Sequence, residues 1–199
     1  MLKKFSLLSA SFFLFVFVAS SANACVGKSL VIGSLNTPSL STISEMMGIL
    51  ITERTGTTVI VKYFDSFPAL ADAEKKGQVD VMVDYAGRCY VDVLGKSPVS
   101  DEKKIFSVVK EDYQRDKNLV WLEPFGFHDV GVVKGNTPAY AAPVIRKDTL
   151  SKFPALPRVI SKLAGKVDNS IMAKLVSEGG ANGKTKKATR KFLKDNRLI

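Results

Sequence analysis

Short apolar runs alternate with helical patterns across the first half of the chain. The runs at 29–33 and 79–85 are typical of buried strands, and the run at 57–63 is rich in β-branched residues, which favour strands. Between them, 43–54 and 68–76 have the spacing of helices with one apolar side. The order strand–helix–strand–helix–strand predicts parallel strands joined by right-handed crossovers.

The second half of the chain reads as further strands followed by helices. We expect a helix over 101–116, a strand over 119–122 and a short strand at 144–145. The stretch 124–143 is rich in Gly, Pro and Asn and reads as a loop. Four helices are predicted to close the chain, over 148–152, 155–163, 168–178 and 184–196, with Asp148 and Asp168 as N-caps. The predicted fold class is α/β, a three-layer arrangement in which helices flank a mostly parallel sheet.

The first 24 residues have the three parts of a secretory signal peptide. Lys3 and Lys4 give a positive start, 5–18 is apolar, and Ala22-Asn23-Ala24 offers small residues for cleavage. The apolar run is shorter than the ~20 residues of a membrane span. We therefore predict a signal peptide over 1–24, a single mature domain over 25–199 and a periplasmic location. An uncleaved anchor and lipid attachment at Cys25 are the alternatives, and neither is favoured.

The mature chain keeps two cysteines, Cys25 and Cys89. Export permits a disulfide. However, Cys25 opens the first predicted strand and Cys89 follows the end of a later one, so parallel strands would hold the two thiols at opposite ends of the sheet. A disulfide needs Cα atoms within about 7 Å, and we predict that these two cysteines are not bridged to each other.

The chain is basic, with a formal net charge of +10, and much of that charge lies in the tail over 182–199. A basic tail can bind nucleic acid or anionic lipid. It can equally be the solvated face of a helix, and this second interpretation is favoured because Ala188, Phe192 and Leu193 recur at helical spacing. We predict a docked helix and no nucleic-acid partner.

No enzyme or metal chemistry is indicated. His128 is the only histidine and is expected to be a partly exposed loop residue. The chain has no Gly-x-Ser-x-Gly elbow, no cluster of Cys and His for zinc, and no glycine-rich nucleotide loop after a strand. We predict no cofactor, no metal and no catalytic residue.

Four segments together resemble the substrate-binding proteins of ABC osmoprotectant importers, the glycine betaine/choline-binding (OpuAC-type) family. They are Val31-Ile-Gly-Ser34, Glu53-Arg-Thr-Gly56, Gly77-Gln-Val-Asp-Val-Met-Val-Asp-Tyr-Ala-Gly87 and Val120-Trp-Leu-Glu-Pro-Phe-Gly-Phe127. The third is similar to the family's G-E-I-D-I-x-x-E-Y-T-G and the fourth to its W-L-x-P-x-G-F-N. The closing helices are similar to the family's as well, so the resemblance covers most of the mature chain.

One departure from the family concerns the crossover. In the family the chain passes into a second lobe after the Gly-Phe-Asn motif and then returns. Here the corresponding stretch is too short, since a single βαβ unit takes about 30 residues. We therefore predict one periplasmic-binding-protein-like lobe, with a core over 25–127, a shortened crossover over 128–143, and a returning strand with C-terminal helices over 144–199.

The resemblance implies a ligand site at the carboxyl ends of the strands, where open α/β sheets bind ligands. Tyr85 is the candidate for an aromatic cage around a quaternary ammonium, and Phe127 is a second aromatic candidate. Phe125 and Trp121 are further aromatic candidates, but Trp121 lies within a predicted strand and is expected to be a core residue. The polar candidates are Ser34, Asn36, Ser39 and Ser66. The family has Thr where this chain has Arg88; its positive charge argues against a quaternary ammonium and leaves room for an anionic ligand.

Two functions follow from this interpretation. The first is an exported solute-binding protein that binds a small solute, a quaternary ammonium or similar, and delivers it to an ABC permease. The second is a single-lobe protein-interaction module of the envelope that carries no solute. Because one lobe half-encloses a ligand, we expect weak binding or a site completed by a partner, including a second copy in a homodimer.

Overall fold

The computed structural model describes residues 29–129, 131–133, 137–179 and 184–199. The predicted signal peptide over 1–24 lies outside the described residues. Cys25 does too, so the predicted absence of a bridge between Cys25 and Cys89 stays a prediction; Cys89 is buried and forms no disulfide with any residue that the structure describes.

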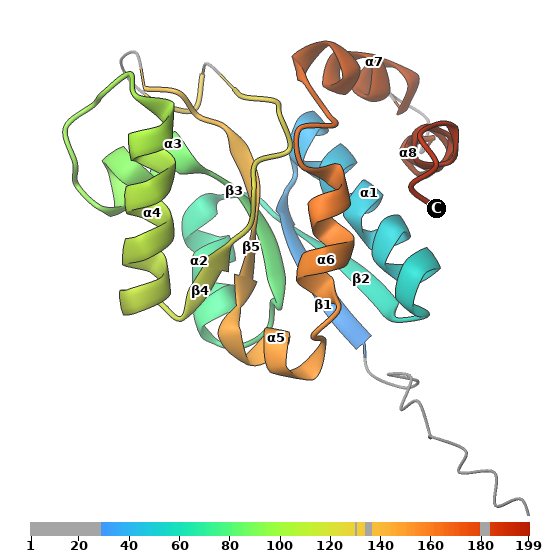
Figure 1. Ribbon diagram of the computed structural model, residues 1–199, viewed down its shortest axis with the longest axis horizontal. Helices are drawn as coiled ribbons and strands as arrows, with labels where there is room; N and C mark the ends of the chain where they lie inside the picture. Colours follow the sequence, from blue (N-terminus) through green and yellow to red (C-terminus); the bar gives the residue numbers. More distant parts are fainter. Residues whose placement is uncertain (1–28, 130, 134–136, 180–183) are drawn as a thin grey trace, which may run out of the picture.

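A five-stranded sheet forms the centre of the molecule, in the order β2-β1-β3-β5-β4 (Figure 1). β1 pairs in parallel with both β2 and β3, whereas β5 runs antiparallel to β3 and to β4. Four strands therefore point the same way and one points back, which confirms the predicted mostly parallel sheet. The strands are β1 (Ser29–Leu35), β2 (Thr58–Phe64), β3 (Val81–Tyr85), β4 (Leu119–Trp121) and β5 (Ala141–Arg146).

Helices cover both faces of this sheet, which confirms the three-layer prediction. One face carries α1, α6, α7 and α8, and the other carries α2 and α4 (Figure 1). A short α3 continues directly into a π-helix, η1. The helices are α1 (Pro38–Thr55), α2 (Phe67–Lys75), α3 (Ala86–Arg88), η1 (Cys89–Val93), α4 (Glu102–Asp116), α5 (Lys147–Lys152), α6 (Leu156–Ile160), the 3₁₀-helix η2 (Ser161–Leu163), α7 (Asn169–Gly179) and α8 (Thr185–Asp195).

The helix boundaries follow local signals in the sequence. Pro38 occupies the first turn of α1, and Gly56 ends it with a left-handed φ of 70°, a conformation that glycine adopts without a steric cost. The Ser66 hydroxyl caps α2 by accepting a hydrogen bond from the Ala69 N–H. Asp168 caps α7 as predicted, since its carboxylate accepts from the Ile171 N–H at 2.8 Å. The predicted Asp148 cap is wrong, because α5 begins one residue earlier and the Asp148 carboxylate pairs with Arg146 instead.

β5 begins earlier than the sequence predicts and includes Pro143. The strand runs from Ala141, through part of the stretch expected to be a loop. The Pro143 carbonyl accepts from the Leu122 N–H at 2.9 Å, just past the end of β4, so it faces the β4 side of the strand. A residue's N and O point to the same side of a strand, so the missing N–H faces the side where β4 has ended and not the ladder with β3.

The C-terminal tail docks as a helix, as its spacing predicts. Ala188, Thr189 and Leu193 of α8 are buried, and α8 packs against α1 and α7. Arg54 of α1 reaches the end of the chain and donates from Nε to the Leu198 carbonyl at 2.6 Å. In the described ranges, no helix combines the length and the apolar character that crossing a membrane requires.

The crossover between the two halves of the chain is a tight excursion and not a second lobe. Phe127 and Ala141 are joined by a backbone hydrogen bond, and His128 and Tyr140 form an antiparallel bridge beyond it. His128 is partly exposed, as predicted. The returning segment lies against α3, where the Ala86 N–H donates to the Tyr140 carbonyl at 3.0 Å. This short excursion leaves the chain as a single lobe.

The contact between the crossover and α3 leads to a stability prediction. A Cβ added to Gly87 would lie 2.3 Å from the Pro138 carbonyl oxygen, which is a backbone atom with little freedom to move. We expect Gly87→Ala to lower the free energy of unfolding by about 1–3 kcal/mol, the usual cost of overpacking. Urea denaturation of the purified chain measures it.

The matched control is Gly48→Ala in the interior of α1. Its added Cβ would lie 3.4 Å from Val59, a tolerable contact, and Ala is favoured over Gly in a helix by up to about 1 kcal/mol. Equal stability of the two variants would contradict the tight packing of the crossover on α3.

Candidate functional site

The carboxyl ends of β1, β2 and β3 lie together at one edge of the sheet. Because the three strands are parallel, the loops that follow Leu35, Phe64 and Tyr85 meet there. The Asn36 N–H donates to the Phe64 carbonyl at 3.0 Å and ties the first two loops together. The predicted polar candidates, Ser34, Asn36, Ser39 and Ser66, lie in or next to these loops.

The polar candidates differ in how far they reach solvent. Asn36 and Ser66 are exposed and Ser39 is half-buried. Ser34 is fully buried, and its hydroxyl donates to the Leu35 carbonyl at 3.0 Å. Asn36, Ser39 and Ser66 therefore have accessible surface at the carboxyl edge, whereas Ser34 contributes to packing beneath it; the ligand-binding roles of all four remain predictions.

The aromatic candidates are buried. Tyr85 is 2% exposed and lies edge-on to Phe67, with the ring centroids 6.3 Å apart. Burial, together with the Asp129 and Asp84 carboxylates, raises the pKa of the Tyr85 phenol. Phe127 stacks on Phe125 inside the core at 6.1 Å. Neither Tyr85 nor Phe127 presents an open ring face to solvent, and their roles as cage residues remain predictions.

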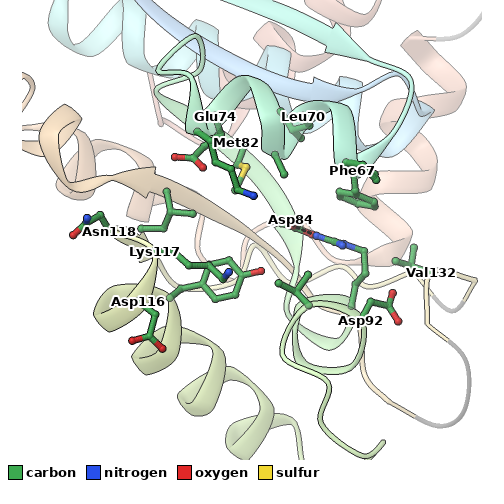
Figure 2. Close-up of a pocket in the computed structure, with 17 residues that line it drawn as sticks. Phe67, Leu70, Glu74, Met82, Asp84, Asp92, Asp116, Lys117, Asn118 and Val132 are labelled. Carbon is green, nitrogen blue, oxygen red and sulfur yellow. Dashed lines mark hydrogen bonds and ion pairs between the residues drawn. The ribbon is translucent and has the colours of Figure 1, made fainter.

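A groove of about 880 Å³ lies between α2 and α4 (Figure 2). Its apolar lining includes Leu70 from α2, Met82 from β3 and Leu119 from β4. β5 separates β3 from β4 in the sheet, and neither α2 nor α4 covers the strip between them, which is why the groove exists.

The groove has two chemically different ends. Figure 2 shows Glu74, Lys117 and Asn118 at one end, and Phe67 and Asp92 toward the other. Phe67 opens α2 just after β2, so this second end coincides with the carboxyl edge of the sheet. The groove and the edge therefore form one continuous candidate site.

An ion pair occupies the end of the groove near Phe67. Asp84 projects from β3, and Arg88 lies one turn later on α3; their side chains are 4% and 13% exposed. Arg88 donates from Nε to Asp84 Oδ1 at 2.9 Å and from Nη2 to Oδ2. Burial on its own lowers the pKa of Arg88, but the Asp84 carboxylate outweighs it and the pKa lies above its ordinary value. The Asp84 carboxylate therefore lies directly against the Arg88 guanidinium and offsets its positive charge.

The Arg88 guanidinium also covers an aromatic ring. Its central carbon lies 3.8 Å from the centroid of the Phe67 ring, well within the range of a cation–π contact. Sequence reasoning placed Arg88 at the site but missed Phe67 and Asp84. The available signals were a charged residue within a buried strand with Arg four positions later, and an aromatic residue at a helix start.

Comparisons with known proteins agree with this architecture. The fold and the edge site define a periplasmic-binding-protein-like lobe. The family model for the substrate-binding domain of ABC-type glycine betaine transport systems matches residues 28–133, more than half of the chain. The chain belongs to this family, which is one of substrate-binding proteins and not of enzymes.

Two solved structures share the fold at low sequence identity. The crystal structure of a glycine betaine/carnitine/choline ABC transporter protein is 17% identical with a TM-score of 0.75, and the match covers 86% of this chain and 98% of that one. Apo YehZ from Escherichia coli is 13% identical with a TM-score of 0.72, covering 86% and 100% of the two chains. A search of the curated proteins gives no match. These likenesses confirm the fold.

The groove end at Glu74 leads to a pH prediction. Burial raises the pKa of the Glu74 carboxyl above 4.5, against the opposing effect of Arg146. Because the folded chain holds the Glu74 proton more tightly than the unfolded chain does, protonated Glu74 stabilises the fold below pH 4.5. This stabilisation is lost as the pH rises through the raised pKa. We expect Glu74→Gln to be more stable than the unmodified chain at pH 7, with the difference vanishing near pH 3.

Thermal denaturation between pH 3 and pH 8 measures this difference. Glu111→Gln on the exposed side of α4 is the control and should follow the unmodified chain at every pH. A Glu74→Gln variant that is less stable at pH 7, or whose advantage persists at pH 3, would show that burial does not dominate at this carboxyl.

Proposed function

We propose that the chain is the exported solute-binding component of an ABC importer, and that its solute docks where the carboxyl edge of the sheet meets the groove. Membership of the substrate-binding family supports solute binding and does not favour the protein-interaction alternative. The observation that carries the location is the meeting of Phe67, Asp84 and Arg88 at the one place that belongs to both the edge and the groove.

The solute class follows from the chemistry of this meeting point. A quaternary ammonium has no N–H to donate, so a protein holds it with aromatic faces and a nearby negative charge. Phe67 supplies a partly exposed ring and Asp84 a carboxylate. We therefore propose an organic cation or zwitterion of the glycine betaine or choline type, bound by an aromatic residue that the sequence-based site did not include.

One lobe gives this solute a wall on one side only. Ligand pockets usually bury about 70–90% of a small ligand, and the stretch between Phe127 and β5 is too short to supply the opposite wall. We propose weak binding by the isolated chain, with the ABC permease or a second copy completing the site. The predicted homodimer would be the assembly in which a second copy completes the site.

Solute binding is tested by thermal shift with glycine betaine, choline, proline and anionic solutes at millimolar concentration. A solute at 100 times its Kd stabilises by about 2.7 kcal/mol, roughly 5–10 °C for a domain of this size. We expect glycine betaine or choline to raise the Tm progressively with concentration. Potassium chloride at equal ionic strength should not do so.

Phe67→Leu tests the location. It removes the aromatic face and keeps an apolar side chain, so the shift produced by the quaternary ammonium solutes should be lost. Phe106→Leu on α4 is the matched control, because Phe106 is also half-buried but lies outside the groove. If no solute shifts the Tm, the protein-interaction alternative is favoured; if both variants bind equally well, the solute binds elsewhere.

Export is part of the proposal and is tested separately. We expect expression of the full sequence in a Gram-negative host to yield a periplasmic chain that begins at Cys25, because Ala22-Asn23-Ala24 provides the cleavage site. Intact-mass measurement of the periplasmic fraction reads the N-terminus. A chain that retains its first residues in the membrane fraction, or one with a lipid mass added at Cys25, would identify the anchored alternatives.

A further inference from the structure

Arg88 sits where a bound organic cation would sit. Its guanidinium carbon is 3.8 Å from the Phe67 ring centroid, and the side chain is largely buried in the groove end. A cation over an aromatic face at this distance, out of contact with most of the solvent, makes a strong form of the cation–π contact. The half-buried ring of Phe67 is therefore already covered by a positive charge of the chain itself, the Arg88 guanidinium.

The same guanidinium also takes up the carboxylate. Both oxygens of Asp84 accept from Arg88, and Oδ1 accepts in addition from the Tyr85 N–H at 2.7 Å. This main-chain contact orients the carboxylate independently of the Arg88 side chain's own hydrogen bonds. Asp84 and Phe67 thus form a preorganised receptor for a cation, and Arg88 fills it.

We propose that Arg88 is a tethered competitor for the solute's cationic group, so that an organic cation binds only after Arg88 leaves Phe67. This inference rests on the proposed function. It differs from a role of Arg88 in attracting an anionic solute, because the positive charge of Arg88 is offset by the Asp84 carboxylate.

Asp92 is the candidate partner for a displaced Arg88 side chain. Asp92 lies four residues further along the same helical segment, is exposed, lines the same end of the groove, and makes no ion pair with any described residue. A guanidinium that leaves Asp84 can pair with Asp92 while the solute takes its place over Phe67. Arg88 therefore lowers the affinity for every organic cation by the free energy of its own displacement.

The test removes the Arg88 side chain and measures the binding of free organic cations. Tetramethylammonium and choline chlorides are titrated into the purified chain and into Arg88→Ala, with potassium chloride as the salt control, and both Tm and ligand-detected NMR are recorded. We expect Arg88→Ala to bind both cations at least about tenfold more tightly than the unmodified chain does. Ring-current shifts of the methyl protons report contact with an aromatic face.

Two further variants locate the gain. Arg88→Ala combined with Phe67→Leu should lose it, because the aromatic face is gone. Arg88→Met fills the space over Phe67 without a charge and should gain less than Arg88→Ala. Should Arg88→Ala fold poorly with Asp84 left uncompensated, Asp84→Asn combined with Arg88→Ala opens the same ring without a buried charge and should still bind the cations more tightly than the unmodified chain.

The outcomes separate this inference from the proposed function. Unchanged or weaker cation binding in both the Arg88→Ala and the Asp84→Asn/Arg88→Ala proteins would overturn the competitor role, as would a gain that survives Phe67→Leu. If the unmodified chain binds no solute while Arg88→Ala binds organic cations, the competitor role stands and the proposed solute function fails. If the unmodified chain binds a solute and loss of Arg88 brings no gain, the proposed solute function stands and the competitor role fails.

Discussion

The position of β5 determines most of what is distinctive about this lobe. β5 runs antiparallel between β3 and β4 and pairs with both, so among the described strands it joins β4 to the parallel strands of the sheet. The helices that follow it do not cover the groove face: α6 packs against α1 on the opposite side. The groove between α2 and α4 is lined from the sheet by Met82 and Asp84 of β3 and by Leu119 of β4, the two strands that β5 holds apart.

β5 can reach that position because the crossover turns back at once. The hydrogen bond between Phe127 and Ala141 and the packing of Pro138 on Gly87 bring the returning chain directly beside β3. The same short turn provides no second lobe over the carboxyl edge. One feature of the backbone therefore both shapes the groove and leaves the carboxyl edge of the sheet uncovered by a second lobe.

The buried ion pair gives this open edge its chemical character. Desolvating two charges is costly, and a buried pair is retained at little net gain in stability. Asp84 and Arg88 are held together by two hydrogen bonds and by the Phe67 ring, so neither charge is left uncompensated. Because Arg88 lies against both Phe67 and Asp84, the aromatic ring and the carboxylate at this edge are already in contact with a positive charge of the chain.

The sequence alone determined the elements that depend on short-range signals. The parallel β1–α1–β2–α2–β3 order, the cap at Asp168, the docked tail helix and the single-lobe length all follow from patterns spanning a few residues or from counting them. Only the tertiary structure decided that Pro143 lies inside a central strand, that Tyr85 and Phe127 are buried, and that Phe67 meets Arg88. The reason is physical: these outcomes depend on strand register and on contacts between elements far apart in the chain, which no local pattern encodes.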